Sequence, residues 1–184
     1  MKLGKFINLT GKKRYLREND IGNVIRYIIR QRSNEKDIKE LVSWGGFGIP
    51  EWREAEGIIE AFKEVQKLHT RNGKFGRYID HEFYSFTDDE VVSIKESNAD
   101  MDSIAREMAS DFYQDGTQVV YALHEKEKEN GKVNLHVHFA VNTVDYRTGK
   151  KRRENMTDTG ERSIRMNEIV ERHIKEAFRT KRLP

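Results

Sequence analysis

The spacing of apolar residues along the chain predicts a series of amphipathic helices, because residues three and four positions apart share one helix face. The first such face consists of Ile21, Val24, Ile25 and Ile28. Asn19 or Asp20 can cap this helix at its amino end, and we expect the helix to end near residue 32. Further helices are expected at 34–44, from Pro50 onward, at 100–114 and at 166–179.

Shorter segments alternate between apolar and polar side chains, which is the pattern of a strand with one buried face. Such segments lie at 5–9, 77–87, 117–124 and 133–143. The pair Asn130-Gly131 between the last two is typical of a hairpin turn. Because the chain has 184 residues and no evident repeat, we expect a single α+β domain over residues 1–184, with an antiparallel sheet of about five strands backed by helices.

The composition restricts the chemistry of any site. Hydrophobic residues make up 36% and charged residues 35% of the chain, yet nine Phe and seven Tyr favour a packed core over disorder. Without Cys, a metal site must be built from His, Asp or Glu. No apolar run approaches the roughly 20 residues of a membrane helix, and residues 1–8 are too short for a signal sequence. We therefore expect a cytoplasmic protein without membrane insertion. Its end directly after a helix-like stretch is compatible with an N-terminal fragment of a longer protein.

Basic residues gather in two segments, although the net charge is only +3. The first basic cluster is Lys12, Lys13 and Arg14, and the second is Arg147, Lys150, Lys151, Arg152 and Arg153. Such clusters can follow the phosphate backbone of a nucleic acid, and Tyr146 beside the second cluster could stack on a base. Solvated loops have the same composition, so charge alone leaves both interpretations open.

The strand expected at 133–143 is the most informative segment, because it carries two histidines on one face. Successive side chains of a strand point to opposite faces. One face consists of Leu135, Val137, Phe139 and Val141, and the other of His136, His138 and Ala140. His124 ends the preceding strand. Three histidines on adjacent strands can converge on one divalent cation and leave positions open for water or phosphate.

The face on which His124 lies depends on the turn between the two strands. A two-residue turn at Asn130-Gly131 would pair His124 with Val137 and direct it away from His136. We therefore expect residues 125–132 to form a longer loop or to contain a bulge. Unrelated histidines on a solvated sheet face are the alternative. A His-x-His strand with a third His on its hairpin partner favours the metal site.

Three segments resemble the motifs of relaxases, the HUH endonucleases of conjugative and mobilisable plasmids. These segments are NVIRYI at 23–28, HEFYSF at 81–86, and His124 together with HVHFAVN at 136–142. They resemble, in that order, the first, second and third motifs of the family. Their order and spacing are similar to those of VirD2-like relaxases across residues 5–150.

The resemblance implies a DNA nickase specific for a plasmid transfer origin. In such an enzyme, His124, His136 and His138 bind one divalent metal ion, Mn²⁺ or Mg²⁺. Tyr27 is the nucleophile, which leaves a 5′-phosphotyrosine link for conjugative transfer. The implied partners are single-stranded DNA at the transfer origin, accessory relaxosome proteins and a coupling protein. The second basic cluster follows the histidine-bearing strand, so we expect it to emerge near the metal and to hold DNA.

Two departures from the family pattern point to a divergent branch such as the MOBL group. Lys126 stands where the family often has an Asp, and the interval between the first two histidines is longer than usual. The acid that supports the histidines is therefore open. The candidates are Glu82, which we place first because an acid in the second-motif strand has this role in some relatives, and Glu125 and Glu127.

The helix pattern by itself also singles out Tyr27. At 100° per residue, Tyr27 lies well away from the apolar face of its helix, so the core does not need it and it can project toward a neighbouring site. Other tyrosines, at 78, 84 and 121, are expected in strands, where aromatic residues ordinarily pack. Tyr15, beside the first basic cluster, is the alternative nucleophile or a residue that stacks on DNA.

Two other functions stay open at this point. An HUH replication initiator shares the histidines and the tyrosine chemistry, but its catalytic Tyr usually follows the histidines on a C-terminal helix. The last expected helix contains no Tyr, which favours the relaxase order. A non-catalytic nucleic-acid-binding module would carry the histidines incidentally, and a test of metal dependence on single-stranded DNA separates it from both enzymes.

Overall fold

The computed structural model describes residues 3–9, 15–31, 35–50, 54–70 and 75–182, without the side chains of 35–37. Its elements follow the chain in the order β1 (Lys5–Asn8), α2 (Asn19–Ile28), α3 (Glu35–Glu40), β2 (Leu41–Phe47), α4 (Ala55–Lys67), β3 (Ile79–Ser85), α5 (Asp88–Ser97), α6 (Met101–Gln114), β4 (Val119–Glu127), β5 (Val133–Asn142) and α7 (Met156–Lys181). No helix in these ranges is long and apolar enough to cross a membrane.

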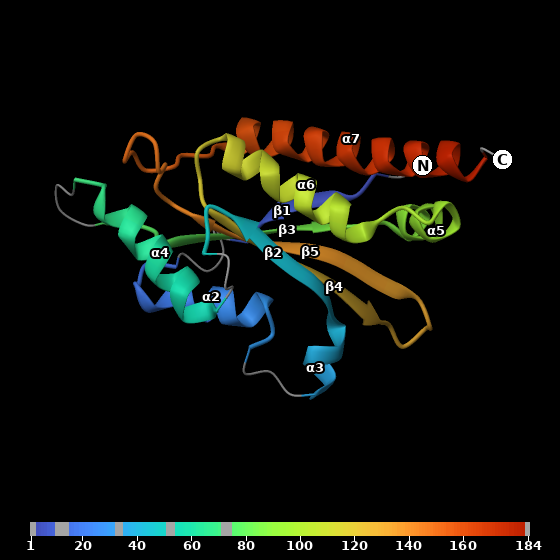
Figure 1. Cartoon of the computed structure of the whole chain (residues 1–184), viewed down its shortest axis with the longest axis horizontal. Helices are drawn as coiled ribbons and strands as arrows, with labels where there is room; N and C mark the ends of the chain where they lie inside the picture. Colours follow the sequence, from blue (N-terminus) through green and yellow to red (C-terminus); the bar gives the residue numbers. More distant parts are fainter. Residues whose placement is uncertain (1–2, 10–14, 32–34, 51–53, 71–74, 183–184) are drawn as a thin grey trace.

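A five-stranded sheet in the order β1-β3-β5-β4-β2 lies at the centre of the molecule (Figure 1). Every neighbouring pair is antiparallel. The expected α+β class, with about five antiparallel strands backed by helices, is confirmed. β5 is the middle strand and is hydrogen-bonded to a neighbour on each side. It carries His136 and His138.

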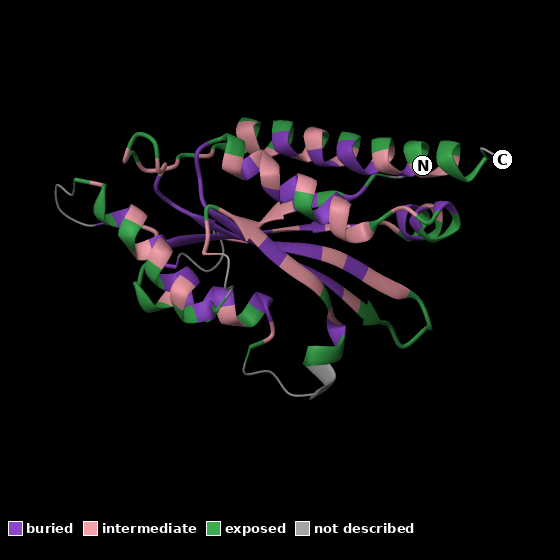
Figure 2. Ribbon diagram, in the orientation of Figure 1, coloured by how far each residue is buried: buried purple, intermediate pink, exposed green. Residues whose placement is uncertain are grey.

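Helices cover both faces of this sheet (Figure 1). In Figure 2 the buried residues, drawn in purple, lie on the sides of these helices that face the sheet. Helices α5, α6 and α7 lie on one face, over a core that includes Leu135, Val137, Phe139 and Val141. Helices α2 and α4 lie on the other face, over Val120, Ala122 and Ala140. The alternation expected along β5 is thereby confirmed. The histidines share the face of Ala140, on the side of α2.

The connection between β4 and β5 is longer than a two-residue turn, as expected. Residues 128–132 form the loop, in which the amide of Lys128 donates to the carbonyl of Lys132 at 2.7 Å. Gly131 has φ +73°, a conformation that side chains with a Cβ rarely adopt. With this loop, His124 pairs with His136 instead of Val137. The longer loop therefore brings the third histidine to the correct face.

The helix expected at 34–44 is wrong in its second half. Helix α3 ends at Glu40, and residues 41–47 form strand β2 at the edge of the sheet, paired with β4. Gly46 lies inside this strand because a Cβ there would collide with the carbonyl oxygen of Val119 on β4. Gly46 is therefore a site where two strands approach closely.

Other element boundaries also differ from the expectations. Helix α2 ends at Ile28 instead of near residue 32, and α4 begins at Ala55 instead of near Pro50. Helix α7 begins at Met156, ten residues before the expected start at 166. Helix α5 was missed, although Thr87 and Glu90 form a capping box at its start. Its apolar stripe is short, so periodicity alone did not reveal it.

Candidate active site

Three histidines meet on the α2 face of the sheet. His124 on β4 pairs directly with His136 on β5, and His138 is two residues further along the same strand. The ring centroids of these residues are 4.8 to 5.3 Å apart. One ring nitrogen from each lies within 4.8 Å of the others, so the triad can hold one metal ion. The site expected from the sequence is assembled as three neighbouring side chains.

The chemistry of the triad fits a divalent cation. Nδ1 of His136 is buried and has no hydrogen-bond partner among the described residues, which leaves a lone pair for an ion. Burial lowers the pKa of His124 to about 4. Burial also holds the pKa of His136 and of His138 below the usual value for histidine. The three rings are therefore neutral at physiological pH, and the neutral imidazole is the form that binds metals.

Two of the histidines are oriented through their second ring nitrogen. Nε2 of His124 donates to the carbonyl oxygen of Ile28, at the end of α2, over 2.6 Å. Nδ1 of His138 lies 3.1 Å from Nε2 of His81, whose own Nδ1 lies 3.1 Å from the hydroxyl of Tyr15. Such contacts fix which nitrogen of a ligating histidine is available to the metal. Sequence analysis missed His81, although it begins the segment that resembles the second motif.

Tyr27 projects from α2 over the edge of the triad. Its ring centroid lies 5.8 Å from that of His138 and 6.0 Å from that of His81. The side chain is 49% exposed, whereas the neighbouring Ile28 is fully buried. Tyr27 is therefore both beside the histidines and open to solvent, which is the position expected from its place on the helix. Tyr15 is only 8% exposed, and burial raises the pKa of its hydroxyl.

Glu82 does not reach the histidines, so its assignment as their supporting acid is corrected. Glu82 pairs with Phe139 across β3 and β5, and paired residues share a face, so it lies on the side of the sheet opposite to the triad. Its Oε1 bonds Asn8 and Arg152 there, at 3.2 and 2.8 Å. The same alternation directs Glu125 and Glu127 away from the histidines, because they pair with 135 and 133.

The acid on the triad side is Glu40, at the end of α3, which sequence analysis also missed. Its carboxylate forms ion pairs with Arg30 at 3.0 Å and with Lys126 at 3.2 Å. Arg30 in turn lies 3.3 Å from Nδ1 of His124. Lys126, the residue that departs from the family pattern, is therefore matched by an acid from another element. No local signal reveals this pairing, because residues 40 and 126 are far apart in the sequence.

The second basic cluster lies differently from expectation. Strand β5 continues for four residues after His138, roughly 13 Å, before this loop begins, so the loop does not emerge beside the histidines. Arg152 is buried and bonds Asp80, Glu82 and Glu154. Lys12, Lys13 and Arg14 of the first cluster lie outside the described residues.

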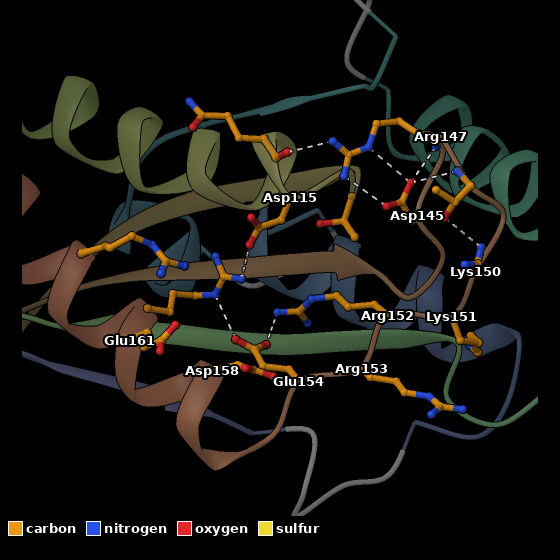
Figure 3. A pocket seen from close by; sticks show the side chains of 15 residues that line it. Asp115, Asp145, Arg147, Lys150, Lys151, Arg152, Arg153, Glu154, Asp158 and Glu161 are labelled. Carbon is orange, nitrogen blue, oxygen red and sulfur yellow. Dashed lines mark hydrogen bonds and ion pairs between the residues drawn. The ribbon is translucent and has the colours of Figure 1, made fainter.

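The rest of the second cluster also makes contacts within the protein. Figure 3 shows Arg147 and Arg152 turned toward carboxylates in a pocket that is lined by both acidic and basic side chains. Lys151 bonds Thr143 at 2.7 Å and lies over the ring of Phe75. Tyr146 stacks on Tyr113, with centroids 5.3 Å apart. Lys150 and Arg153 are exposed and remain the best candidates in this loop for contact with DNA.

The nuclease-domain model of the MobA/VirD2-like relaxases matches residues 27–175. The chain belongs to this family. The match includes Tyr27 and all three histidines, and it excludes Tyr15. The protein is therefore a relaxase nuclease domain, an enzyme that nicks DNA for plasmid transfer, as the resemblance of its motifs implied. Its assignment to the MOBL group stays a prediction.

A solved relaxase structure shows the same fold. The metal-bound conjugative relaxase TrwC in complex with oriT DNA is similar to this relaxase domain with a TM-score of 0.50 at 12% identity, over 98% of this chain and 71% of that chain. The metal-free TrwC complex with oriT DNA has a TM-score of 0.45 at 12% identity, with the same coverage. No curated protein matches the sequence. At this identity, the likeness to TrwC shows that the two proteins share a fold.

Proposed function

We propose that this relaxase domain cuts one DNA strand at a transfer origin by transesterification, with Tyr27 as the nucleophile. The observation that carries the proposal is the half-exposed ring of Tyr27 beside His138, at the rim of a histidine triad in which His124 and His138 are buried. A nucleophile for a large substrate must be accessible on one side and close to the electrophilic centre on the other. Among the tyrosines near the triad, Tyr27 meets both needs, whereas Tyr15 is buried behind His81.

The three histidines would hold one divalent cation, Mn²⁺ or Mg²⁺, which supplies positive charge to the scissile phosphate. The phenolic oxygen of Tyr27 forms a bond to phosphorus as the bond from phosphorus to the 3′ oxygen breaks. Tyr27 loses its proton to solvent, and the 3′ oxygen takes one up. The DNA 5′ end stays on Tyr27 as a phosphodiester of similar energy, so a later 3′ hydroxyl can reverse the step.

The proposed substrate is single-stranded DNA at the transfer origin, in the bacterial cytoplasm. Accessory relaxosome proteins and a coupling protein are the further partners that such an activity requires. The exposed Lys150 and Arg153, with Lys12, Lys13 and Arg14, are the proposed contacts to the phosphate backbone.

The test is formation of a covalent adduct with a labelled oligonucleotide that carries the transfer origin. The wild-type chain should form the adduct with Mn²⁺ or Mg²⁺ and lose it with a chelator. Tyr27→Phe should abolish the adduct and keep DNA binding, because only the hydroxyl is removed. Tyr15→Phe is the matched control and should still form it. An adduct that persists in Tyr27→Phe and disappears in Tyr15→Phe would reverse the assignment of the nucleophile.

A further inference from the structure

Arg30 lies between the proposed nucleophile and the histidine triad, although it belongs to none of the motifs discussed above. It follows α2 with φ +57°, the left-handed region that a residue with a Cβ seldom adopts. Helices commonly end in this conformation at the residue after the C-cap, but the residue there is usually Gly, sometimes Asn. The conformation directs the Arg30 side chain back toward the sheet instead of into solvent, and the side chain is only 9% exposed.

The guanidinium contacts three parts of the site at once. Its central carbon lies 5.0 Å from the centroid of the Tyr27 ring. Its Nη2 lies 3.0 Å from the carboxylate of Glu40 and 3.3 Å from Nδ1 of His124. A buried cation that touches both the nucleophile and a metal ligand is placed where a phosphate must lie during in-line attack.

The donors of Arg30 are not used up by these contacts. Its Nε is buried and has no hydrogen-bond partner among the described residues. A buried donor without an acceptor is costly. An arginine whose role was only to pair with Glu40 would typically bind the carboxylate through two N–H groups, whereas Arg30 does so through Nη2 alone. The contact with His124 also occupies a lone pair that a metal ligand needs, because the other nitrogen of that ring donates to Ile28. Metal binding at Nδ1 of His124 would therefore free one N–H of Nη2, while the other still donates to Glu40.

The positive charges around Arg30 outnumber the negative ones. Glu40 is shared between two cations, Arg30 and Lys126, while the histidines are neutral. Arg30 and Glu40 are largely buried and Lys126 is half-exposed, so two positive side chains and one carboxylate leave one positive charge at this edge of the site, before any metal ion is counted. A phosphodiester carries one negative charge and several acceptor oxygens, so it satisfies both the free donor and the charge.

We propose that Arg30 is a further catalytic residue, which binds a non-bridging oxygen of the scissile phosphate and holds that phosphate between Tyr27 and the histidine triad. The inference rests on the proposed function of this site. Removal of a donor that acts on the reacting group typically slows catalysis by about 10²–10³-fold. A purely structural role, as a support for His124, would instead weaken metal binding.

The first experiment separates these two roles through metal affinity. Calorimetry with Mn²⁺ should show unchanged or tighter binding in Arg30→Gln, because a cation beside the ligands has been removed, whereas His136→Ala should lose most of its affinity. Arg26→Gln is the matched control: Arg26 lies on α2, the helix that Arg30 follows, pairs with Glu56 at 2.9 Å and also has an Nε without a hydrogen-bond partner among the described residues. A loss of Mn²⁺ affinity in Arg30→Gln comparable to that in His136→Ala would overturn the proposal.

The second experiment measures the contact with phosphate directly, by DNA binding in a chelator and in the Tyr27→Phe background. One oligonucleotide carries the normal phosphate at the cleavage site, and the other a neutral methylphosphonate there. With Arg30 present, the methylphosphonate should weaken binding about ten- to a hundredfold, the size of one charge-assisted hydrogen bond. With Arg30→Gln the two oligonucleotides should bind equally, and with Arg26→Gln the difference should persist.

Additive effects of Arg30→Gln and the methylphosphonate would show that Arg30 does not touch this phosphate, and would overturn the inference. The proposed function would survive that result, because it is judged by a different measurement. It fails only if the wild-type chain forms no adduct or if the adduct persists in Tyr27→Phe.

Discussion

At the scale of single residues, two histidines of the triad are oriented by groups other than carboxylates. The second ring nitrogen of His124 bonds a backbone carbonyl, and that of His138 faces the imidazole of His81. A carboxylate in either place would cancel part of the charge of a bound cation. Without a carboxylate partner a bound cation would keep more of its charge for the substrate phosphate. The contact of His81 with the second ring nitrogen makes it a positioning residue for His138.

We expect His81→Ala to weaken Mn²⁺ binding by about 10- to 100-fold, since a partner that orients a metal-ligating histidine typically contributes that much. His81→Gln should recover part of the loss, because an amide can still bond the ring of His138. Calorimetry on the folded variants measures both effects. His173→Gln is the control, as this histidine on α7 pairs with Glu107 on α6, on the other face of the sheet. Wild-type affinity in His81→Ala would exclude the positioning role.

The buried histidines should also make the metal-free protein sensitive to acid. The pKa of His124 falls from 6.5 to about 4 on folding, so between these values the unfolded chain binds more protons than the folded one. Stability is then full above pH 6.5 and is lost as the pH falls toward 4. The shift corresponds to about 3 kcal/mol for this residue. Urea unfolding at pH 7.5 and pH 4.5 measures the loss, and His124→Gln should show a smaller one. Equal pH dependence in the two proteins would contradict this account.

At the scale of elements, the loop of the β4–β5 hairpin decides whether the triad forms. One residue fewer or more in the pairing would turn His124 to the opposite face, because strand side chains alternate. Gly131 allows the loop its observed path, with φ +73° and open space around its Cα. The conformation of this single glycine is therefore connected to the register of two strands and to the position of a metal ligand.

Two glycine substitutions should have opposite effects on stability. Gly131→Ala should destabilise the protein by about 1–2 kcal/mol, because a Cβ is strained in the left-handed region. Gly160→Ala, inside α7 and also with open space around it, should stabilise by up to about 1 kcal/mol, because alanine favours the helix. Urea denaturation of both variants gives the two signs. A stabilising Gly131→Ala would mean that the loop does not adopt this conformation in solution.

At the scale of the whole molecule, a network of buried ion pairs joins the sheet to the helices on the side away from the triad. Arg152 pairs with Asp80 and Glu82 on β3 and with Glu154 before α7. Glu154 also pairs with Arg162 on α7, which in turn reaches α6. Burial raises the pKa of Glu82 to about 7 in spite of Arg152, so this carboxylate depends on its partner to stay charged.

Removing the charge of different residues in the second basic cluster should therefore have different effects on stability. Arg152→Ala should cost about 3–5 kcal/mol of stability, because it leaves buried carboxylates without their partner. Lys150→Ala with Arg153→Ala should leave stability within about 0.5 kcal/mol of wild type. If these two residues contact DNA, the double variant should lower the salt dependence of single-stranded DNA binding by about 0.7 in log–log slope per lost contact. An unchanged slope would place the DNA path elsewhere, with the first basic cluster as the next candidate.

The sequence by itself determined the features that depend on local periodicity. Alternation along β5 placed His136 and His138 on one face, and the stripe of α2 left Tyr27 outside the core. Their motifs were sufficient to identify the family, and the same patterns located four of the five strands but not β2. These features were predictable because a side chain's direction within one strand or helix depends only on its own neighbours along the chain.

Tertiary structure alone decided which distant residues complete the site. His81 reaches His138 because β3 pairs with β5, and Glu40 meets Lys126 and Arg30 because α3 and β2 pack beside β4. The placement of Glu82 on the far face and the burial of Arg152 were decided in the same way. Strand order and register arise from contacts between segments far apart in the sequence, and a local pattern does not specify which segments will pair.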